Sequence, residues 1–449
     1  MTIDIIPFVD PGLGNSSYMV GLPDQRALVI DPRRDPSTYL HEAEVRGWDI
    51  VAGVETHLHA DFISGGRELQ AVGAALYAPA GSELAFAHRP LEPEGDVTFG
   101  GLTLKALPSP GHTPEHLSYL LSDGTRPLAL FSGGSLLVGA VARTDLIAPD
   151  QTEELTRQMF RSMRDVLAPL PDDLAVFPTH GAGSFCSAGV GGDRVTTMGR
   201  ERATNPFLRV EEEDQFVKLL LANLGTYPVY YGRLRERNRI GPRVYGGEGP
   251  RLAAIAPDEF DRLRRDGATV VDVRPAASWA GGHLPGSLSI PLRDEFALWL
   301  GWLVDIDDTI IFVTEAGQDR PGLVRACLGI GFENLAGELA GGTEAWSASG
   351  RRLNSTARAP IGVLDAQMID VRQSSEWETG HIPGVLHAEL GDLAAAGLPS
   401  RSLAVHCGRS DRASTAASVL ERAGRTDVTV LIGGPEDWSR TTGRPLEVG

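Results

Sequence analysis

The chain is poor in cysteine, in long apolar runs and in net positive charge. Its 449 residues hold only 3 cysteines, Cys186, Cys327 and Cys407, which cannot all pair within one chain, so a disulfide-stabilised fold is not expected. The longest apolar stretches, such as FALWLGWLV (296–304), are too short to span a bilayer. The formal net charge of −18 argues against nucleic acid and anionic membranes as partners, because both attract basic surfaces.

The remaining composition is that of a globular protein, with 42% hydrophobic and 22% charged residues. The first residues, MTIDIIPFVD, carry acids and no basic segment ahead of an apolar run, so no secretory signal is expected there. Together with the unpaired cysteines this predicts a cytoplasmic protein. The length predicts about three domains. A homodimer or higher homo-oligomer is expected, because dimers are the commonest assembly.

An internal repeat occupies the second half of the chain. The stretch VVDVRPAASWAGGHLPGSLSIPL (270–292) matches MIDVRQSSEWETGHIPGVLHAEL (368–390), and GGTEAW (341–346) recurs as GGPEDW (433–438). Each copy alternates short β-rich runs with helical stretches, which predicts an α/β domain built on a parallel sheet.

Two linker-like segments mark the domain boundaries. They are the Gly/Pro-rich VYGGEGPR (244–251) and the polar RRLNSTARAP (351–360). We therefore predict a multidomain protein with domains over 1–245, 250–353 and 360–449.

The second copy carries the loop HCGRSDRAS (406–414) between a strand and a helix. At such a helix N-terminus, backbone N–H groups and the helix dipole favour an anion, here a thiolate or persulfide on Cys407. Arg412 is predicted to return to the same cradle. The alternative is a small buried cysteine that only closes the strand. The other residues of the predicted cradle are Gly408, Arg409, Ser410 and Asp411.

These residues resemble the rhodanese family in the DVR…EW…GHIPG element, the C-x4-R loop and the closing GG…W…GRPL. The resemblance implies that Cys407 carries a sulfane sulfur as a persulfide and passes it to a thiophilic acceptor. In the first copy Glu315 takes the position of Cys407, so that copy is predicted to be structural. Cys327 falls on an apolar helical face and is predicted to be part of the core.

Histidines follow several apolar runs of the first 245 residues. They lie in THLHADF (56–62), in SPGHTP (109–114) and in PTHG (178–181). Loops at strand ends are where sites are built, so this pattern indicates a metal centre. The predicted ligands are His57, His59 and His112, with Asp61 and His180 as further candidates.

The same motifs resemble the metallo-β-lactamase superfamily, and within it glyoxalase II and the persulfide dioxygenases. FSGGSLL (131–137), RTDL (143–146) and ERATNPFL (201–208) add to the likeness. The resemblance implies an αβ/βα sandwich, one Fe(II) and the oxidation of a low-molecular-weight persulfide by O₂ to sulfite and thiol. Followed by two rhodanese domains, such a domain is similar to bacterial fusion enzymes of hydrogen sulfide detoxification.

Two positions depart from that resemblance. Phe62 stands where the superfamily has a histidine for a second metal, and Gly134 stands where the dioxygenases have an aspartate ligand. A set of three histidines suits Zn²⁺ at least as well as Fe(II). Cys186, six residues past His180, is a candidate persulfide relay.

The leading hypothesis is a persulfide dioxygenase combined with a Cys407 sulfurtransferase that uses sulfite and thiosulfate. One alternative is a sulfurtransferase whose first domain is a metal-free scaffold. Another is a zinc-dependent thioester hydrolase. The sequence leaves open which small thiol carries the persulfide and in which direction the sulfur moves.

Overall fold

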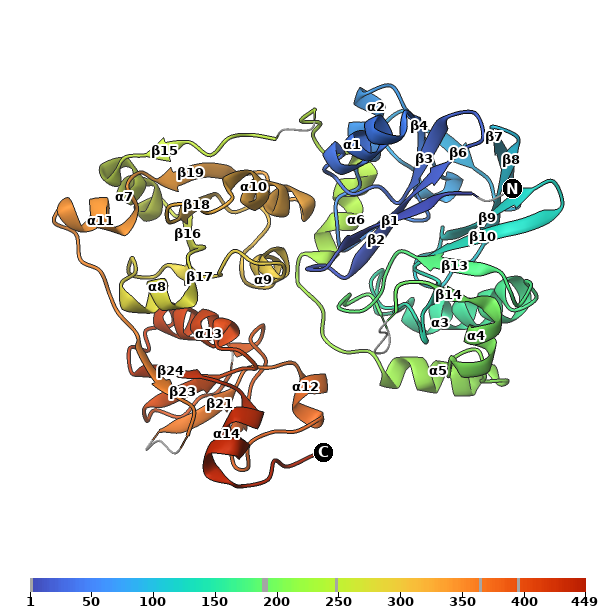
Figure 1. Ribbon diagram of the computed structural model, residues 1–449. Helices are drawn as coiled ribbons and strands as arrows, with labels where there is room; N and C mark the ends of the chain where they lie inside the picture. The colour runs from blue at the N-terminus through green and yellow to red at the C-terminus, as the bar shows by residue number, and fades with distance from the viewer. Residues whose placement is uncertain (1–2, 188–192, 247–248, 363–365, 394–395) are drawn as a thin grey trace. The chain divides into compact units, whose positions relative to one another are not determined.

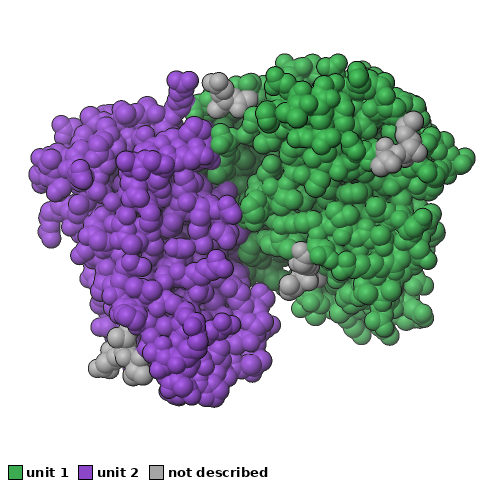
Figure 2. All heavy atoms as spheres, viewed as in Figure 1, with its two compact units in different colours: residues 1–250, 325–331 green, residues 251–324, 332–449 purple. Residues whose placement is uncertain are grey.

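The computed structural model describes residues 3–187, 193–246, 249–362, 366–393 and 396–449. The chain divides into two compact units, one of residues 1–250 with 325–331 and one of residues 251–324 with 332–449 (Figure 2). None of the described helices is long and apolar enough to cross a membrane.

The first unit contains two six-stranded sheets and the short hairpin β11–β12 (Figure 1). The first sheet has the order β1-β2-β3-β4-β5-β6, and the second has the order β14-β13-β10-β9-β8-β7. The strands of the first sheet are β1 (Ile5–Asp10), β2 (Asn15–Gly21), β3 (Arg26–Ile30), β4 (Asp49–Val54), β5 (Ala75–Pro79) and β6 (Arg89–Leu91). The others are β7 (Asp96–Phe99), β8 (Leu102–Pro108), β9 (Leu117–Asp123), β10 (Arg126–Gly133), β11 (Leu136–Leu137), β12 (Ala140–Val141), β13 (Ala175–Pro178) and β14 (Thr196–Thr197).

Apolar residues from both sheets share one core, which includes Tyr18, Leu28, Leu104 and Phe131. Helices cover the outer faces: Tyr39 and other residues of α1 and α2 pack on the first sheet, and residues of α3 and α5 pack on the second. This is the predicted αβ/βα sandwich. The helices are α1 (Ser37–Arg46), α2 (Gly66–Ala71), α3 (Thr152–Arg161), α4 (Met198–Thr204), α5 (Glu213–Ala222) and α6 (Tyr231–Ile240), with a 3-10 turn at Ala80–Ser82 and a π-helical turn at Ser162–Leu167.

The second unit contains two five-stranded sheets whose strand pairs are all parallel. Their orders are β15-β19-β18-β16-β17 and β20-β24-β23-β21-β22, the same path traced twice, as the repeat predicts. Strands such as β18 are fully buried and rich in β-branched residues, which is typical of parallel strands covered on both faces. The strands are β15 (Ala254–Ile255), β16 (Thr269–Asp272), β17 (Leu288–Ser289), β18 (Ile310–Val313), β19 (Leu335–Leu339), β20 (Ala357–Pro360), β21 (Gln367–Asp370), β22 (Leu386–His387), β23 (Leu403–His406) and β24 (Val428–Ile432).

Helices of the two copies complete the layers around these sheets. In the second copy α13 packs on β23 and β24, and it also contacts β17 and α8 of the first copy. The Ser289 N–H donates to Ser418 Oγ across this contact at 3.0 Å. The helices are α7 (Pro257–Arg265), α8 (Ala276–Gly281), α9 (Phe296–Leu303), α10 (Arg320–Gly329), α11 (Gly342–Ala348), α12 (Ser374–Glu378), α13 (Asp411–Arg422) and α14 (Pro435–Thr442).

Candidate metal centre and Cys407 loop

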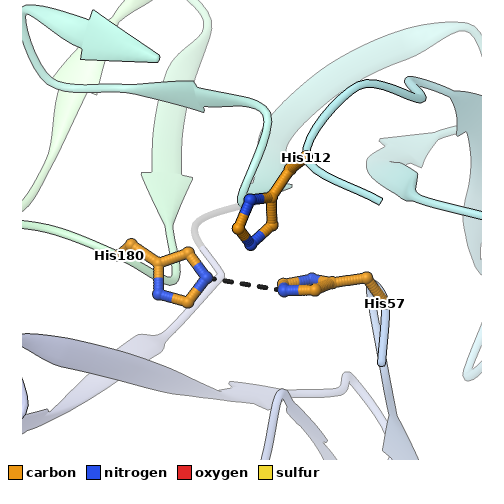
Figure 3. A group of neighbouring side chains, drawn as sticks. All are labelled: His57, His112 and His180. Carbon is orange, nitrogen blue, oxygen red and sulfur yellow. Dashed lines mark hydrogen bonds between the residues drawn. The ribbon is translucent and has the colours of Figure 1, made fainter. Parts of the chain in front are cut away.

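Three histidines from both sheets of the first unit meet at one point (Figure 3). His57 follows β4, His112 follows β8 and His180 follows β13. One ring nitrogen of each lies within 4.8 Å of the other two, and all three side chains are buried. The His57 Nε2 and His180 Nε2 atoms are 3.4 Å apart.

A hydrogen-bond chain fixes the tautomer of His57. The Thr56 hydroxyl donates to Asp31 Oδ2 at 2.8 Å, so its oxygen accepts the proton on His57 Nδ1, also at 2.8 Å. His57 Nε2 is then left with a lone pair. Burial, followed by the neighbouring histidines, holds the pKa of His57 well below its usual value, so the ring stays neutral.

The other two rings are held in the same way. His112 Nδ1 donates to the Arg143 carbonyl at 2.7 Å, and His180 Nδ1 faces Asn15 Oδ1 at 3.1 Å and Asp61 Oδ2 at 3.2 Å. Burial, followed by the neighbouring His180 ring, lowers the pKa of His112 to about 3. His57 and His112 therefore present Nε2 lone pairs, which is the form in which histidine binds metals, and the Nδ1 contacts of His180 turn its Nε2 atom toward His57.

The donor set fits a divalent metal ion. His57 Nε2 and His180 Nε2 face each other at 3.4 Å, a separation that suits a hydrogen bond between them or a cation bound by both. Nitrogen ligands about 2.0–2.1 Å from a tetrahedral metal are about 3.3–3.4 Å apart, which is close to the separation of His57 Nε2 and His180 Nε2. Three protein ligands also leave a coordination position for a substrate.

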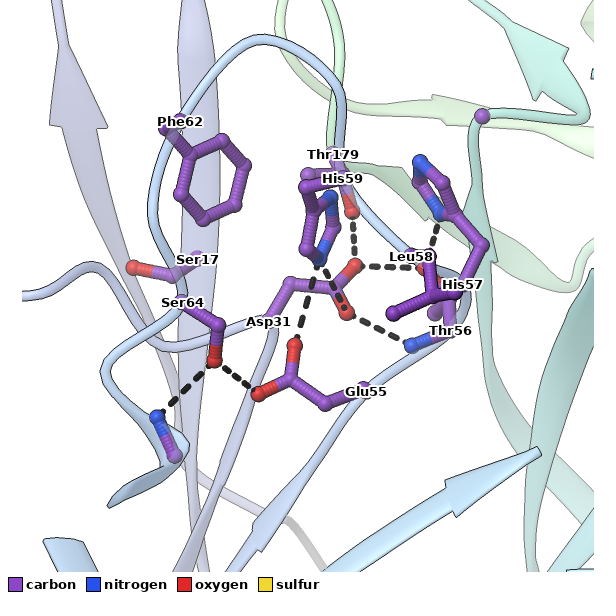
Figure 4. A network of polar contacts seen from close by, with 12 residues as sticks. Ser17, Asp31, Glu55, Thr56, His57, Leu58, His59, Phe62, Ser64 and Thr179 are labelled. Carbon is purple, nitrogen blue, oxygen red and sulfur yellow. Dashed lines mark hydrogen bonds and ion pairs between the residues drawn. The ribbon is translucent and has the colours of Figure 1, made fainter. Parts of the chain in front are cut away.

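His59, predicted as a ligand, lies in a different group (Figure 4). Its Nε2 is 3.2 Å from Glu55 Oε2 and 3.3 Å from Asp31 Oδ1. Burial lowers its pKa, but the two carboxylates outweigh that effect and raise the pKa of His59 to about 10. The ring of His59 thus turns toward buried acids, while His180 completes the group with His57 and His112.

Asp61 and Phe62 lie on the same loop. Asp61, His59 and His180 form a second group whose ligand atoms lie within 4.8 Å of one another. The Phe62 ring stacks on the His59 ring with a centroid separation of 4.2 Å. Phe62 therefore fills space beside His59 without offering a ligand atom.

Because Gly134 has no side chain, the ring of His112 can lie close to its backbone. A Cβ atom at this position would lie 2.3 Å from His112 Cδ2, so the His112 ring occupies the space that an aspartate side chain would need. A side chain at position 134 would therefore require the His112 ring to move.

Gly134→Ala is expected to destabilise the first unit by about 1–3 kcal/mol, because the new methyl group overpacks His112. Chemical denaturation of the metal-free protein measures the change. The exposed Gly225→Ala serves as a control, since an added Cβ there meets nothing within 4 Å. Equal stabilities of the two variants would contradict the expectation.

The stability of the metal-free protein is expected to peak near pH 6.5. The folded pKa of His112, about 3, lies below the ordinary 6.5, so stability is lost as the pH falls from 6.5 toward 3. The folded pKa of His59, about 10, lies above 6.5, so its contribution is lost as the pH rises through 10. Each group changes the free energy of unfolding by up to about 1.4 kcal/mol per pH unit. Denaturation at several pH values tests this, and stability that rises on acidification from pH 6.5 would contradict it.

Cys186, the candidate relay, is fully buried near Asp61. Burial, followed by the negative charge of Asp61, raises the pKa of its thiol well above the usual value. Because the thiolate is the nucleophile, this environment disfavours a relay.

The Cys407 loop lies in the second copy of the repeat, at the N-terminus of α13. The Ser410 N–H donates to Cys407 Sγ at 3.1 Å, and Ser410 adopts a left-handed φ of 82° at the turn. Cys407 itself is 1% exposed, while Gly408 and Arg409 are exposed. This N–H contact is of the kind that the sequence predicts for the cradle.

The Arg412 side chain lies beside the Cys407 loop. Its guanidinium forms two hydrogen bonds to Glu376, at 2.5 and 2.7 Å, and lies over the ring of Trp299. Its Nη2 would be 3.8 Å from a Cβ atom at position 408. Asp411 pairs with Arg293 at 3.2 Å. Both Trp299 and Arg293 belong to the first copy.

In the first copy, side chains bind the backbone of the equivalent loop, and Glu315, Ala316 and Arg320 line a cavity of about 610 Å³. The Glu315 N–H donates to Gln318 Oε1 at 2.9 Å, and Arg320 donates to the Glu315 carbonyl at 2.7 Å while pairing with Glu338. Cys327 is fully buried, and burial raises the pKa of its thiol. The burial of Cys327 matches its predicted place in the core.

Family models match most of the chain. The metallo-beta-lactamase superfamily model matches residues 10–180, and the rhodanese-like domain model matches residues 256–349 and 354–441. A crystal structure of a metallo-beta-lactamase from Staphylococcus aureus is 28% identical with a TM-score of 0.66, over 76% of this chain and 99% of that one.

Two curated relatives match the first unit. The mitochondrial persulfide dioxygenase ETHE1 of Homo sapiens is 30% identical over 210 residues, 45% of this chain and 75% of the relative. A hydroxyacylglutathione hydrolase of Methylobacillus flagellatus is 31% identical over 205 residues, 41% of this chain and 80% of the relative. The chain therefore belongs to the metallo-beta-lactamase superfamily and joins that domain to two rhodanese-like domains.

Proposed function

We propose that the chain is a sulfur-metabolism enzyme with two centres. At the first, a low-molecular-weight persulfide is oxidised: RSSH + O₂ + H₂O gives RSH and sulfurous acid, which ionises to sulfite. At the second, Cys407 carries the sulfane sulfur. Its persulfide transfers the outer sulfur to sulfite, which yields thiosulfate and restores the Cys407 thiolate.

The observation that carries the proposal is the Cys407 loop. A cysteine at the start of a helix, with the Ser410 N–H on its sulfur, is suited to stabilise a negatively charged sulfur. The four residues between Cys407 and Arg412 match the rhodanese-like pattern. The first copy, with Glu315 in the same position, lacks a sulfur atom to do this.

At the first centre we propose that His57, His112 and His180 hold one metal ion. When bound, the ion supplies Lewis-acid and redox chemistry toward a sulfur anion and O₂. The chain's own residues fix the ligands: Thr56 and the Arg143 carbonyl hold the tautomers of His57 and His112.

The persulfide substrate is supported by the likeness to a persulfide dioxygenase. Thioester hydrolysis with Zn²⁺ is the second candidate, since hydroxyacylglutathione hydrolases are similarly related. Phe62 weakens that candidate because it offers no ligand for a second metal. A metal-free scaffold has no need of three oriented Nε2 atoms, and this weighs against it.

The test uses the full-length protein, prepared without oxygen and loaded with Fe(II) or Zn²⁺. We expect the Fe(II) form to consume O₂ when glutathione persulfide is added and to release sulfite or thiosulfate. Hydrolysis of S-lactoylglutathione by the zinc form, without O₂ uptake, would replace this function with the hydrolase. Sulfur transfer by Cys407 with neither O₂ uptake nor thioester hydrolysis would favour the hypothesis that the first domain is a metal-free scaffold.

A further inference from the structure

The helix α6, which follows the family-matched part of the first unit, lies against the loop that carries His57. We propose that Asn238 on α6 is a positioning residue of the metal centre, because it fixes the backbone of that loop and thereby sets the affinity for the ion. This inference rests on the proposed metal-binding function of His57, His112 and His180.

Asn238 uses its whole side-chain amide on the loop. Its Nδ2 donates to the His59 carbonyl at 2.8 Å and to the Phe62 carbonyl at 2.9 Å. Its Oδ1 accepts from the Ser64 N–H at 2.9 Å. Asn238 is 4% exposed, so water does not readily replace these bonds.

Neighbours of Asn238 hold the same loop at further points. The Tyr230 hydroxyl, just before α6, donates to the Asp61 carbonyl at 3.0 Å. Arg235 on α6 forms two hydrogen bonds to Glu115, at 2.8 and 2.9 Å, and Glu115 Oε1 accepts from the Leu58 N–H at 3.0 Å. Backbone groups of residues 58, 59, 61, 62 and 64 are therefore bound, directly or through Glu115, by residues 230–238, while the Ile63 N–H donates to the Gly329 carbonyl.

This loop needs such partners because it is irregular. Between the end of β4 at Val54 and the start of α2 at Gly66 no helix or strand is assigned, so no ladder satisfies its buried backbone groups. His57 opens the loop, so a shift of its backbone moves the His57 Nε2 atom. Residues that orient metal ligands change metal affinity by about 10–100-fold when they are replaced.

The experiment titrates Co²⁺ into the full-length protein and follows its visible absorption in competition with a chelator. Asn238→Ala is expected to raise the dissociation constant by about tenfold or more and to change the shape of the spectrum. The matched control is Asn223→Ala, since Asn223 is exposed at the end of α5 and bonds only the Leu219 carbonyl among its side-chain contacts in the described residues. This control is expected to behave as the original protein.

Unchanged affinity and an unchanged spectrum in Asn238→Ala would overturn the proposal. If that variant does not fold, Tyr230→Phe removes only one hydroxyl donor and is expected to weaken Co²⁺ binding by a smaller factor, and wild-type affinity there would overturn it instead. His57→Ala tests the metal centre itself, apart from the role of Asn238. If the original protein and His57→Ala bind Co²⁺ equally, the metal centre fails and the positioning role fails with it.

Discussion

Cys407→Ser is expected to abolish sulfur transfer from thiosulfate or a small-thiol persulfide, with a loss of at least about a thousandfold, as is typical when a nucleophile is removed. A serine oxygen is nearly isosteric with the sulfur but does not form a persulfide. The Ser410 N–H keeps an acceptor in the variant, so the loop is expected to stay folded. Transfer of sulfur to cyanide or sulfite measures the effect.

The controls for this variant are the other two cysteines. Cys186→Ser and Cys327→Ser are expected to keep sulfur transfer, since both residues are fully buried. O₂ uptake at the metal centre is expected to persist in Cys407→Ser. Residual transfer by Cys407→Ser close to that of the original protein would mean that another group carries the sulfur.

His112→Ala is expected to lower metal affinity at least about a hundredfold, because the removal of a ligand costs more than the loss of a residue that orients one. Metal content after dialysis, measured by mass spectrometry, gives the result. The control is His41→Ala, which replaces an exposed histidine outside the centre and is expected to keep the full metal content. Stoichiometric metal in His112→Ala would sink the proposed centre.

A second pair of variants decides which histidines bind the ion. His180→Ala is expected to lose metal, whereas His59→Gln is expected to keep most of it. Glutamine can still donate a hydrogen bond to Asp31 or Glu55 but removes the positive charge between them, so unfolding is measured alongside the metal content. The reverse outcome would favour the set expected from the sequence, His57, His59 and His112.

The sequence predicted the architecture well, because the repeat and the strand-end histidines are local patterns. The two copies trace the same sheet order, and His57 and His112 meet as expected. The orientation of His59 could not be predicted, since it depends on Asp31, which lies 28 residues earlier in the chain. No periodicity records such a distant contact.

The surroundings of Gly134 and Arg412 could not be predicted from the sequence either. The sequence revealed the missing carboxylate at position 134, but only the structure shows that His112 takes up its space. Arg412 was expected to return to the cradle, but nothing in the sequence indicated that its guanidinium would bind Glu376. In both cases a neighbour distant in sequence determines where a side chain goes.

The hydrogen bonds of the first-copy loop bear on whether this copy could be made to carry sulfur. The Glu315 N–H is already bound by Gln318 and the Glu315 carbonyl by Arg320, although the loop borders a cavity of about 610 Å³. A cysteine placed at position 315 would thus have space for a sulfur atom, but the N–H of that residue would already have another acceptor. We therefore expect Glu315→Cys alone to be a poor sulfur carrier, and the further change Gln318→Ala to be needed to release this donor.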